Sequence, residues 1–389
     1  MSSSEKKKLV MLLSRVPSKL DKGDKLRAFY QIKYLSESYE IFLICLDTEA
    51  QWYDFSTLEP YCKEIKLYRI TKASRLFNLL KATISGLPFQ VAYFYNSRVK
   101  KDILQYIQNC QPDHIYSQLI RTAEYVKNIH HIPKTIDYMD AFSKGIERRI
   151  KDANWLIKPL FKSENKRLLK YESLIFEYFE HKTIISEIDR EFIFHVDRKK
   201  IEIIENGIDE KFFDVNSKWE NQCNVLFTGN MSYPPNIKAA EFIAKSIAPE
   251  LSSFNFLISG ANSDKLSFGK ISENVKQTGW VEDIRVVYRD AKIFIAPMFI
   301  GTGVQNKLLE AMAMSLPCIT TDLGNKPLGA KVGEEILVAN SKDEFIEQIQ
   351  QLFEDKELYE KISENGRRFV QNHFNWNKST QKLIDIMNK

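Results

Sequence analysis

Residues 292–314 read Lys292-Ile-Phe-Ile-Ala-Pro-Met-Phe-Ile-Gly301-Thr-Gly-Val-Gln-Asn-Lys-Leu-Leu-Glu310-Ala-Met-Ala-Met314. The apolar, partly β-branched run 292–297 predicts a buried strand of a parallel sheet. Gly301 and Gly303 then allow a tight turn and the close approach of a ligand. From Val304 onward the apolar residues recur at helical spacing. The stretch therefore predicts a strand, a glycine-rich turn and a helix.

Three residues of this stretch share one side of the predicted helix. Gly303, Lys307 and Glu310 are separated by three, four and seven positions, which nearly overlap on a helical wheel. A helix N-terminus, a lysine and a carboxylate would together suit a nucleotide diphosphate and its ribose. Considered alone, the stretch fits an ordinary buried helix with a Lys307–Glu310 surface pair better.

The composition is that of a globular protein with more than one domain. The chain has 389 residues, 44% of them hydrophobic, and a net charge of +5, so two domains are expected. No apolar run approaches the ~20 residues that a membrane-spanning helix needs. Five scattered cysteines without metal-binding spacing favour a reducing cytoplasm. The mild positive charge does not indicate a nucleic-acid partner.

Strand-like and helix-like segments alternate along the whole chain, which favours parallel sheets covered on both faces. A polar linker at 216–222 separates two such series. Two α/β domains joined in this way predict a ligand cleft between them. The predicted strands lie at 8–13, 41–46, 64–70, 113–117, 134–138, 182–186, 201–204, 224–228, 255–259, 292–297, 318–321 and 336–339.

Ligands of open parallel sheets bind beyond the carboxyl ends of the strands. The loop 14–24 follows the first predicted strand, and Gly23 would give it close backbone approach to a ligand. A plain connection to the next helix, capped by Asp24, explains the loop equally well.

The segment 144–170 is strongly basic. It holds nine Lys or Arg against three acidic residues, and Lys158, Lys162 and Lys166 gather on one side of a helical wheel opposite apolar residues. Such a helix suits an anionic membrane surface. A solvated face over an ordinary core contact is the commoner explanation, and Pro159 interrupts or restarts the helix.

Several motifs, taken together and in order, resemble the GT-B glycosyltransferases, specifically the large retaining glycosyltransferase family 4, also called group 1, in its bacterial polysaccharide sugar-transferase branch. The resemblance covers most of the chain. The motifs are Asp21-Lys-Gly-Asp-Lys-Leu-Arg27, Ile184-Ile-Ser-Glu187, Ile204-Glu-Asn-Gly-Ile-Asp209, Leu226-Phe-Thr-Gly-Asn-Met-Ser-Tyr-Pro-Pro-Asn-Ile-Lys-Ala239, Thr278-Gly-Trp-Val-Glu-Asp283 and Gly303-Val-Gln-Asn-Lys-Leu-Leu-Glu-Ala-Met-Ala-Met-Ser-Leu-Pro317.

The resemblance implies two Rossmann-like, doubly wound domains facing across a cleft. An acceptor-binding domain would span residues 1–212 and a nucleotide-sugar-binding domain residues 213–370. Residues 371–389, from Phe374-Asn-Trp376 onward, resemble the helix that crosses back to the first domain.

The resemblance also assigns roles to individual residues. Glu310 would accept the two ribose hydroxyls, the turn at 301–304 would meet the diphosphate, and the segment 279–281 would cradle the base. The donor-nucleotide set comprises Gly23, Gly229, Asn230, Gly279, Trp280, Val281, Gly301, Thr302, Gly303, Val304, Lys307 and Glu310.

Two positions depart from the family pattern. The family has a second glutamate eight residues before Glu310, where this chain has Thr302. The family also places an arginine after the Leu-Phe-Thr-Gly strand, where this chain has Asn230. Lys307, helped by Lys238 and the helix N-terminus, would therefore meet the diphosphate charge.

The expected reaction is transfer of a sugar from a UDP- or GDP-sugar to a glycan or lipid-linked acceptor, with retention, in cell-envelope polysaccharide biosynthesis. Lys307 and Glu310 are the catalytic candidates, because an enzyme gains most by stabilising charge that develops on the leaving group. Candidates near the acceptor, at predicted strand ends, are Asp24, Arg121, Asp137 and Asp140.

No Asp-x-Asp follows a strand, so the sequence predicts no metal ligands and no cofactor beyond the nucleotide-sugar substrate. The expected location is the cytoplasm or the inner face of the cytoplasmic membrane. A dinucleotide-dependent oxidoreductase is a weak alternative, because Gly301-Thr-Gly-Val-Gln-Asn lacks the third glycine of that fingerprint. A catalytically silent scaffold or nucleotide-binding subunit is a second alternative, raised by Thr302 and Asn230.

Overall fold

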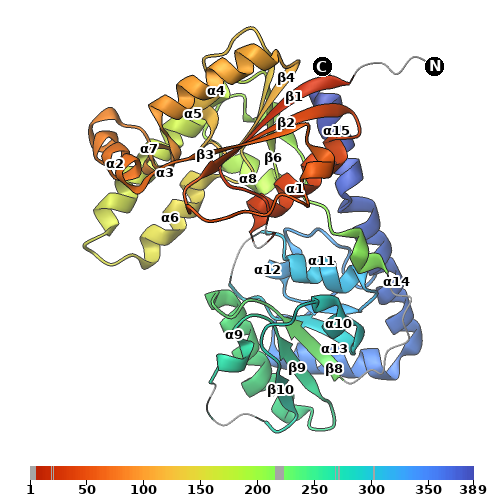
Figure 1. Cartoon of the computed structure of the whole chain (residues 1–389). Coiled ribbons are helices and arrows are strands. Elements are labelled where there is room, and N and C mark those ends of the chain that lie inside the picture. Colours follow the sequence, from red (N-terminus) through yellow and green to blue (C-terminus); the bar gives the residue numbers. More distant parts are fainter. Residues whose placement is uncertain are drawn as a thin grey trace, which may run out of the picture. The chain divides into compact units, whose positions relative to one another are not determined.

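The chain forms two compact α/β units in the computed structural model (Figure 1). The structure describes residues 6–18, 20, 22–214, 223–267, 269, 272–300 and 303–389. Unit 1 comprises Met1–Asn206 together with Trp376–Lys389, and unit 2 comprises Gly207–Asn375. Unit 2 is thus inserted in the sequence of unit 1, ahead of the last helix of unit 1.

Unit 1 is built on a parallel sheet whose described strands number seven, in the order β3-β2-β1-β4-β5-β6-β7. The strands are β1 Lys7–Leu13, β2 Tyr39–Asp47, β3 Glu64–Arg69, β4 His114–Gln118, β5 Lys134–Asp137, β6 His181–Ile184 and β7 Glu202–Ile203. The helices are α1 Gly23–Leu35, α2 Lys72–Ser85, α3 Phe89–Phe94, α4 Ser97–Cys110, α5 Ala123–Val126, α6 Phe142–Asp152, α7 Lys158–Phe176, α8 Glu187–Phe192 and α15 Trp376–Met387.

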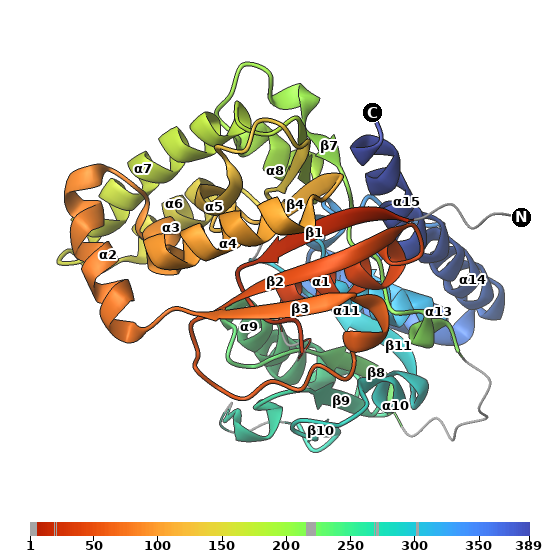
Figure 2. The ribbon, with the colours of Figure 1, turned by 45° about the horizontal axis from the view of Figure 1, so that its top comes forward.

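Helices cover both faces of this sheet, as the alternating pattern of β1 requires. Leu9, Met11 and Leu13 belong to a core shared with α1 and α15, whereas Val10 and Leu12 belong to a core shared with α4. Successive side chains of a strand point to opposite faces, so a run of apolar residues buries a strand on both sides. Figure 2 shows α4 lying along the sheet near β1 and β4.

Unit 2 repeats this plan with a parallel sheet of six described strands, in the order β10-β9-β8-β11-β12-β13. The strands are β8 Cys223–Thr228, β9 Phe256–Ser259, β10 Val275–Gln277, β11 Ala291–Ala296, β12 Cys318–Thr320 and β13 Leu337–Val338. The helices are α9 Pro234–Phe242, continued by a π-helix at Ile243–Ile247, α10 Ile284–Arg289, α11 Asn306–Ala313, α12 Asp322–Asn325, α13 Lys342–Glu354 and α14 Lys356–His373. The prediction of two doubly wound parallel sheets is confirmed.

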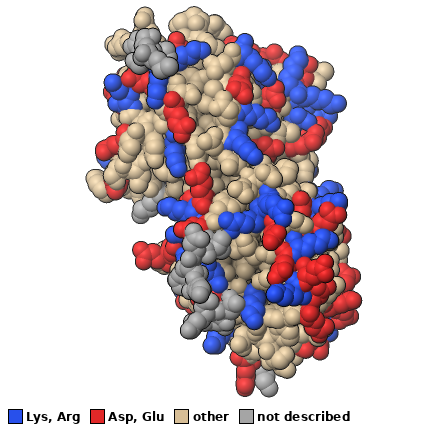
Figure 3. All heavy atoms as spheres, turned by 90° about the vertical axis from the view of Figure 1, so that its right-hand side faces the viewer, with Lys and Arg blue, Asp and Glu red and all other residues tan. Residues whose placement is uncertain are grey.

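The surface carries both signs of charge. On the face in Figure 3, acidic and basic side chains are interspersed over both units, in keeping with a net charge of only +5. Among the described residues, no helix combines the length and apolarity needed to cross a bilayer.

Candidate functional site

In unit 2 the strand–turn–helix run has the predicted form. β11 ends at Ala296 and α11 begins at Asn306. Gly303 has φ +87°, a left-handed conformation that glycine adopts without a steric penalty. Within the described part of the chain, no side chain caps α11 at Gln305, so the first N–H groups of the helix are available to an anion. Gly301 and Thr302 lie outside the described residues.

Lys307 lies in the first turn of α11. Its Nζ donates a hydrogen bond to Oδ1 of Asn236 in α9 and lies 5.2 Å from the centroid of the Phe227 ring. Burial lowers the pKa of Lys307 to about 8, and Glu310 opposes this shift. A cation held in such a partly desolvated position gains from the arrival of an anion.

Glu310 lies one turn further along α11 and finds a different partner. Its Oε2 accepts a hydrogen bond of 2.7 Å from the hydroxyl of Tyr288, which is 2.7 Å from Thr228 Oγ1. Burial raises the pKa of Glu310 to about 7, while Tyr288 and Lys307 act in the opposite direction. Tyr288 therefore orients the carboxylate from behind, and the expected Lys307–Glu310 surface pair is replaced by two separate contacts.

Glycines bring the ends of three neighbouring strands close together. Gly229, Gly260 and Gly279 follow β8, β9 and β10. A Cβ at Gly260, where φ is +117°, would meet the carbonyl oxygen of Gly229 at 2.2 Å. The Gly260 N–H donates to the carbonyl of Gly279 over 3.0 Å. This rim is packed so tightly that only glycine fits at its centre.

The other predicted donor residues lie along the same edge of the sheet. The Asn230 carbonyl accepts from Asn236 Nδ2 over 2.9 Å, so Asn236 joins the backbone at Asn230 to Lys307. Trp280 is 71% exposed and is free to stack on a base, whereas Val281 and Val304 pack against the core of unit 2.

In unit 1, Gly23 is the first residue of α1, and a Cβ there would meet nothing within 4 Å. Asp24 follows in the first turn, where it forms a 2.6 Å ion pair with Arg15. The helix is preceded by Lys22 as its N-cap residue, so the alternative of an Asp24 cap is wrong. Asp24 instead connects α1 to the loop after β1.

Arg121 lies beyond the end of β4. It donates to Gln90 Oε1 over 2.9 Å, and its guanidinium lies over the rings of Phe94 and Phe142. Burial and the neighbouring Arg15 lower the pKa of Arg121 to about 10, while Asp24 and Asp140 oppose the shift. Asp24, Arg121 and Asp140 therefore interact within one region of unit 1.

Asp140 retains an exposed surface even though protein atoms crowd its carboxylate. This crowding and the nearby Asp189 carboxylate raise the pKa of Asp140 to about 6, whereas Arg121 lowers it. A carboxyl group with such a pKa exchanges protons near neutral pH.

Asp137 has a different environment from the other acceptor-side candidates. Its carboxylate is fully buried and pairs with Arg27 Nε over 2.6 Å, and it accepts from the Tyr116 hydroxyl over 2.6 Å. Arg27 also donates to the carbonyl of Ile204. This network lies within the core of unit 1, and the buried Asp137 carboxylate has no exposed surface for an acceptor.

Sequence reasoning missed Arg15, Asn236 and Tyr288. Asn236 stands in the Pro-Pro-Asn motif that follows β8, which was the available signal. Arg15 stands in the loop after the first strand. Tyr288 had no sequence signal, because its contact with Glu310 depends on how α10 packs beside α11.

Residues 222–355 match the family model described as glycosyl transferases group 1. Over most of its length, the chain is similar to an uncharacterized 44.6 kDa protein in the cps region of Klebsiella pneumoniae, with 24% identity over 407 aligned positions that cover 94% of this chain and 96% of that protein. A shorter similarity, 28% over 226 residues, relates 51% of this chain to 56% of the capsular polysaccharide biosynthesis glycosyltransferase CapM of Staphylococcus aureus.

Solved structures match the fold across the chain. Sucrose-phosphate synthase from Thermosynechococcus elongatus superimposes with a TM-score of 0.66 at 15% identity, covering 98% of each chain. HepE of Anabaena, in complex with UDP, gives a TM-score of 0.66 at 12% identity and covers 98% of this chain and 99% of that chain. The fold is that of the GT-B glycosyltransferases, and residues 222–355 are similar to the group 1 glycosyltransferase family.

Proposed function

We propose that this chain transfers a sugar, with retention, from a nucleotide-sugar to a glycan or lipid-linked acceptor in cell-envelope polysaccharide biosynthesis. The observation that carries the proposal is the pair of polar side chains on α11. Asn236 orients Lys307, and Tyr288 orients Glu310, at the carboxyl edge of a parallel sheet. Ligands of such sheets bind at this edge. The relatives named after the cps region and capsular polysaccharide biosynthesis support the pathway.

In this proposal, the ammonium of Lys307 and the first N–H groups of α11 stabilise the diphosphate as the sugar leaves. Negative charge develops there in the transition state, so fixed donors act where they are most effective. The carboxylate of Glu310 accepts the two ribose hydroxyls of the donor. Trp280 and Val281 contact the base. The leaving phosphate takes the proton of the acceptor hydroxyl.

Two measurements test this proposal. Thermal shifts with UDP, GDP and ADP identify the nucleotide, because a ligand of the native state raises its stability. Donor hydrolysis or transfer is then measured for Lys307→Met and Glu310→Gln, with Lys245→Met and Glu241→Gln as controls from an exposed pair in the same unit. We expect losses of at least ~10²-fold for the first two variants, as for removal of a transition-state donor, and none for the controls.

Unchanged rates in Lys307→Met and Glu310→Gln would contradict the site. Nucleotide binding that depends on Lys307 without any turnover would indicate a nucleotide-binding subunit instead. The anomeric configuration of the sugar in the product, read by NMR, tests retention.

The basic segment also supports peripheral binding to an anionic membrane, which would place the chain at the inner face of the cytoplasmic membrane. Between α6 and α7, Trp155 and Leu156 are 77% and 65% exposed, and Lys162 and Lys166 are exposed on the following helix. Exposed apolar and basic groups side by side favour an interfacial position. Pro159 stands in the first turn of α7, where proline is compatible with a helix.

Liposome sedimentation tests this partner. Charge reversal of Lys158, Lys162 and Lys166 to Glu is expected to abolish binding to anionic vesicles. Reversal of three exposed lysines elsewhere, Lys101, Lys276 and Lys356, is the matched control. Equal binding by both triple variants would exclude docking through this segment.

A further inference from the structure

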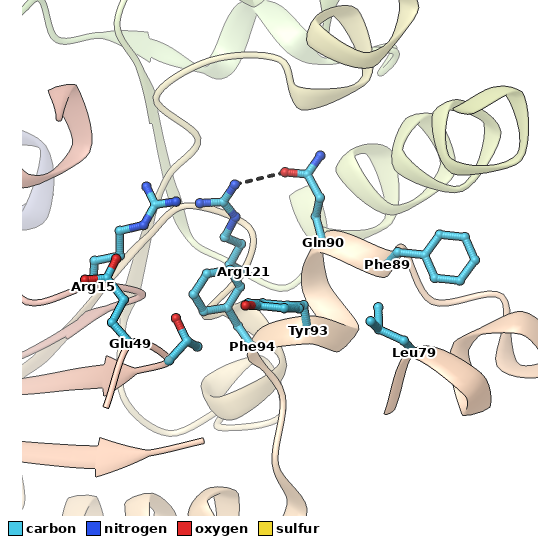
Figure 4. Close-up of a pocket in the computed structure, with 9 residues that line it drawn as sticks. Arg15, Glu49, Leu79, Phe89, Gln90, Tyr93, Phe94 and Arg121 are labelled. Atoms are coloured by element: carbon cyan, nitrogen blue, oxygen red, sulfur yellow. Dashed lines mark hydrogen bonds between the residues drawn. The ribbon is translucent and has the colours of Figure 1, made fainter. Parts of the chain in front are cut away.

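Unit 1 contains a cavity of about 430 Å³ whose walls differ in character. It lies where β1, β2 and β4 end, with Arg15 and Arg121 toward one end and Tyr93 and Leu79 toward the other (Figure 4). The carboxyl ends of parallel strands are the usual ligand-binding edge of such a sheet. Within unit 1, this cavity therefore stands where a ligand is expected.

The polar wall carries two arginines, and the carboxylates that act on Arg121 are Asp24 and Asp140. In Figure 4, the guanidinium groups of Arg15 and Arg121 end beside one another, and Gln90 Oε1 accepts a hydrogen bond from Arg121. Asp24 pairs with Arg15, and Glu49 at the rim pairs with Lys22 over 3.6 Å. Arg121 Nε is buried and has no hydrogen-bond partner among the described residues. An anion in the cavity would add charge-assisted hydrogen bonds to the guanidinium groups of Arg15 and Arg121.

The burial of Arg121 also favours the binding of an anion in this cavity. Desolvation and the charge of Arg15 lower its pKa to about 10, so the cation is held in a position that disfavours its charge. An anion between the two arginines would compensate for both effects, because a nearby negative charge favours the charged form of Arg121. The planar guanidinium group also suits phosphate oxygens, which it can contact through two parallel hydrogen bonds.

The apolar wall continues onto an exposed helix face. Leu79 belongs to α2, and on the neighbouring face of this helix Leu76, Leu80 and Ile84 are 63%, 63% and 92% exposed. Residues four apart share one face of a helix, so these side chains form a continuous stripe. Arg167 of α7 donates to the carbonyls of Leu87 and Thr83 over 3.1 Å each, which fixes the end of α2 against unit 1.

We propose that this cavity binds the phosphate or diphosphate group of an amphipathic acceptor, whose apolar chain lies along the stripe of Leu76, Leu80 and Ile84. The inference rests on the proposed function, because it names the chemical class of the acceptor of that reaction. A cationic wall that leads directly onto an apolar stripe matches a phosphate joined to an apolar chain. A neutral glycan has neither a negative charge for the arginines nor an apolar chain for the stripe.

Binding of farnesyl diphosphate and of inorganic diphosphate, measured by calorimetry on the full chain, tests the proposal. The background variant Lys307→Met removes competition from the donor site. We expect Arg15→Gln and Arg121→Gln each to weaken farnesyl diphosphate binding at least ~10-fold, because each loses charge-assisted hydrogen bonds. Arg98→Gln, at an exposed position on α4, is the matched control and should change nothing.

The apolar stripe is tested separately. Leu76→Ser with Leu80→Ser should weaken farnesyl diphosphate at least ~5-fold and leave inorganic diphosphate unchanged. Val196→Ser, at a position 90% exposed elsewhere in unit 1, is the control. Binding of dihexanoyl phosphatidylglycerol is measured in parallel. Tighter binding of this probe would indicate a phospholipid head group, and tighter binding of farnesyl diphosphate would indicate a lipid-linked diphosphate.

Farnesyl diphosphate binding that is absent, or equal in Arg121→Gln and the background variant, would overturn the inference. Farnesol binding as tightly as farnesyl diphosphate would do the same. Arg121→Lys is a conservative variant that keeps the positive charge. An unchanged melting temperature shows that each variant is folded.

UDP, titrated into the chain with Lys307 intact, separates this inference from the proposed function. If UDP fails to bind while arginine-dependent farnesyl diphosphate binding persists, the donor proposal fails alone. If Lys307-dependent UDP binding persists but arginine-dependent farnesyl diphosphate binding is absent, only the acceptor inference fails.

Discussion

At the residue scale, burial brings the pKa values of Lys307 and Glu310 toward each other. The pKa of Lys307 falls to about 8 and that of Glu310 rises to about 7. In the free protein, the state in which both groups are charged is most populated between these values. A ligand that needs the ammonium for its phosphate and the carboxylate for its ribose would bind best there.

We therefore expect the affinity for UDP, measured by calorimetry from pH 6 to 9.5, to pass through a maximum between about pH 7 and 8. Below this range Glu310 becomes protonated, and above it Lys307 becomes neutral. Glu310→Gln should remove the loss of UDP affinity that Glu310 causes at low pH. Lys307→Arg should remove the loss of UDP affinity at high pH. The titration of UDP itself is common to all variants, so identical profiles would contradict these assignments.

Glu310 should also reduce stability above neutral pH. Its pKa is raised in the folded state, so the folded protein binds its proton more tightly, and this contribution to stability is lost as the pH rises through about 7. Glu310→Gln should therefore raise the melting temperature at pH 8 by a few degrees relative to the native chain, and less at pH 5. An equal change at both pH values would argue against a buried, titrating carboxylate.

At the scale of elements, the strand–turn–helix run was largely predictable from sequence. The predicted strand 292–297 is β11, Ala291–Ala296, and the helix predicted from Val304 is α11, from Asn306. Strand period, glycine turns and helical spacing are local properties that a sequence carries. The partners of the site side chains were not predictable. Lys307 reaches Asn236 and Glu310 reaches Tyr288 only because separate elements meet at one edge of the sheet.

Asp137 and Arg15 also show that the sequence does not predict the partners of a side chain. Both follow or end predicted strands, where sequence reasoning expects ligand contacts. The structure buries Asp137 against Arg27 and places Arg15 on a cavity. Whether such a residue is buried or lines a cavity depends on the side chains that pack against it. The alternation of strands and helices in the sequence does not specify these side chains.

The glycine rim of unit 2 allows a direct test. Gly260→Ala should destabilise unit 2 by about 3 kcal/mol or more, because overpacking and a left-handed alanine act together. Gly329 has φ +75° but open space around its Cβ position, so Gly329→Ala should cost only about 1–2 kcal/mol. Urea unfolding of both variants gives the comparison, and equal costs would show that the contact with Gly229 can relax.

At the scale of the whole molecule, unit 1 is completed by a helix that follows unit 2 in the sequence. Trp376 of α15 stacks on Tyr30 of α1 with ring centroids 5.0 Å apart, and Leu383 belongs to the core behind β1 and β2. The cover on one face of the first sheet thus comes from the other end of the described chain.

Trp376→Ala should destabilise unit 1 by about 3–5 kcal/mol, as expected for truncating a buried tryptophan. Hydrogen exchange should show lost protection in β1 and β2 and unchanged protection in β8 and β11. Trp155→Ala, at a side chain 77% exposed, should leave both sheets protected. Equal loss of protection in the two units would mean that they unfold as one.

The position of α15 also sets an order of assembly during translation. The ribosome releases residues 207–375 before residues 376–387, so unit 2 has its full sequence while unit 1 still lacks its covering helix. At ~5–20 residues per second, the α1 side of the first sheet waits for many seconds with apolar side chains uncovered. The unit whose synthesis begins first is therefore finished last, and nascent chains at this stage are the ones most in need of a chaperone.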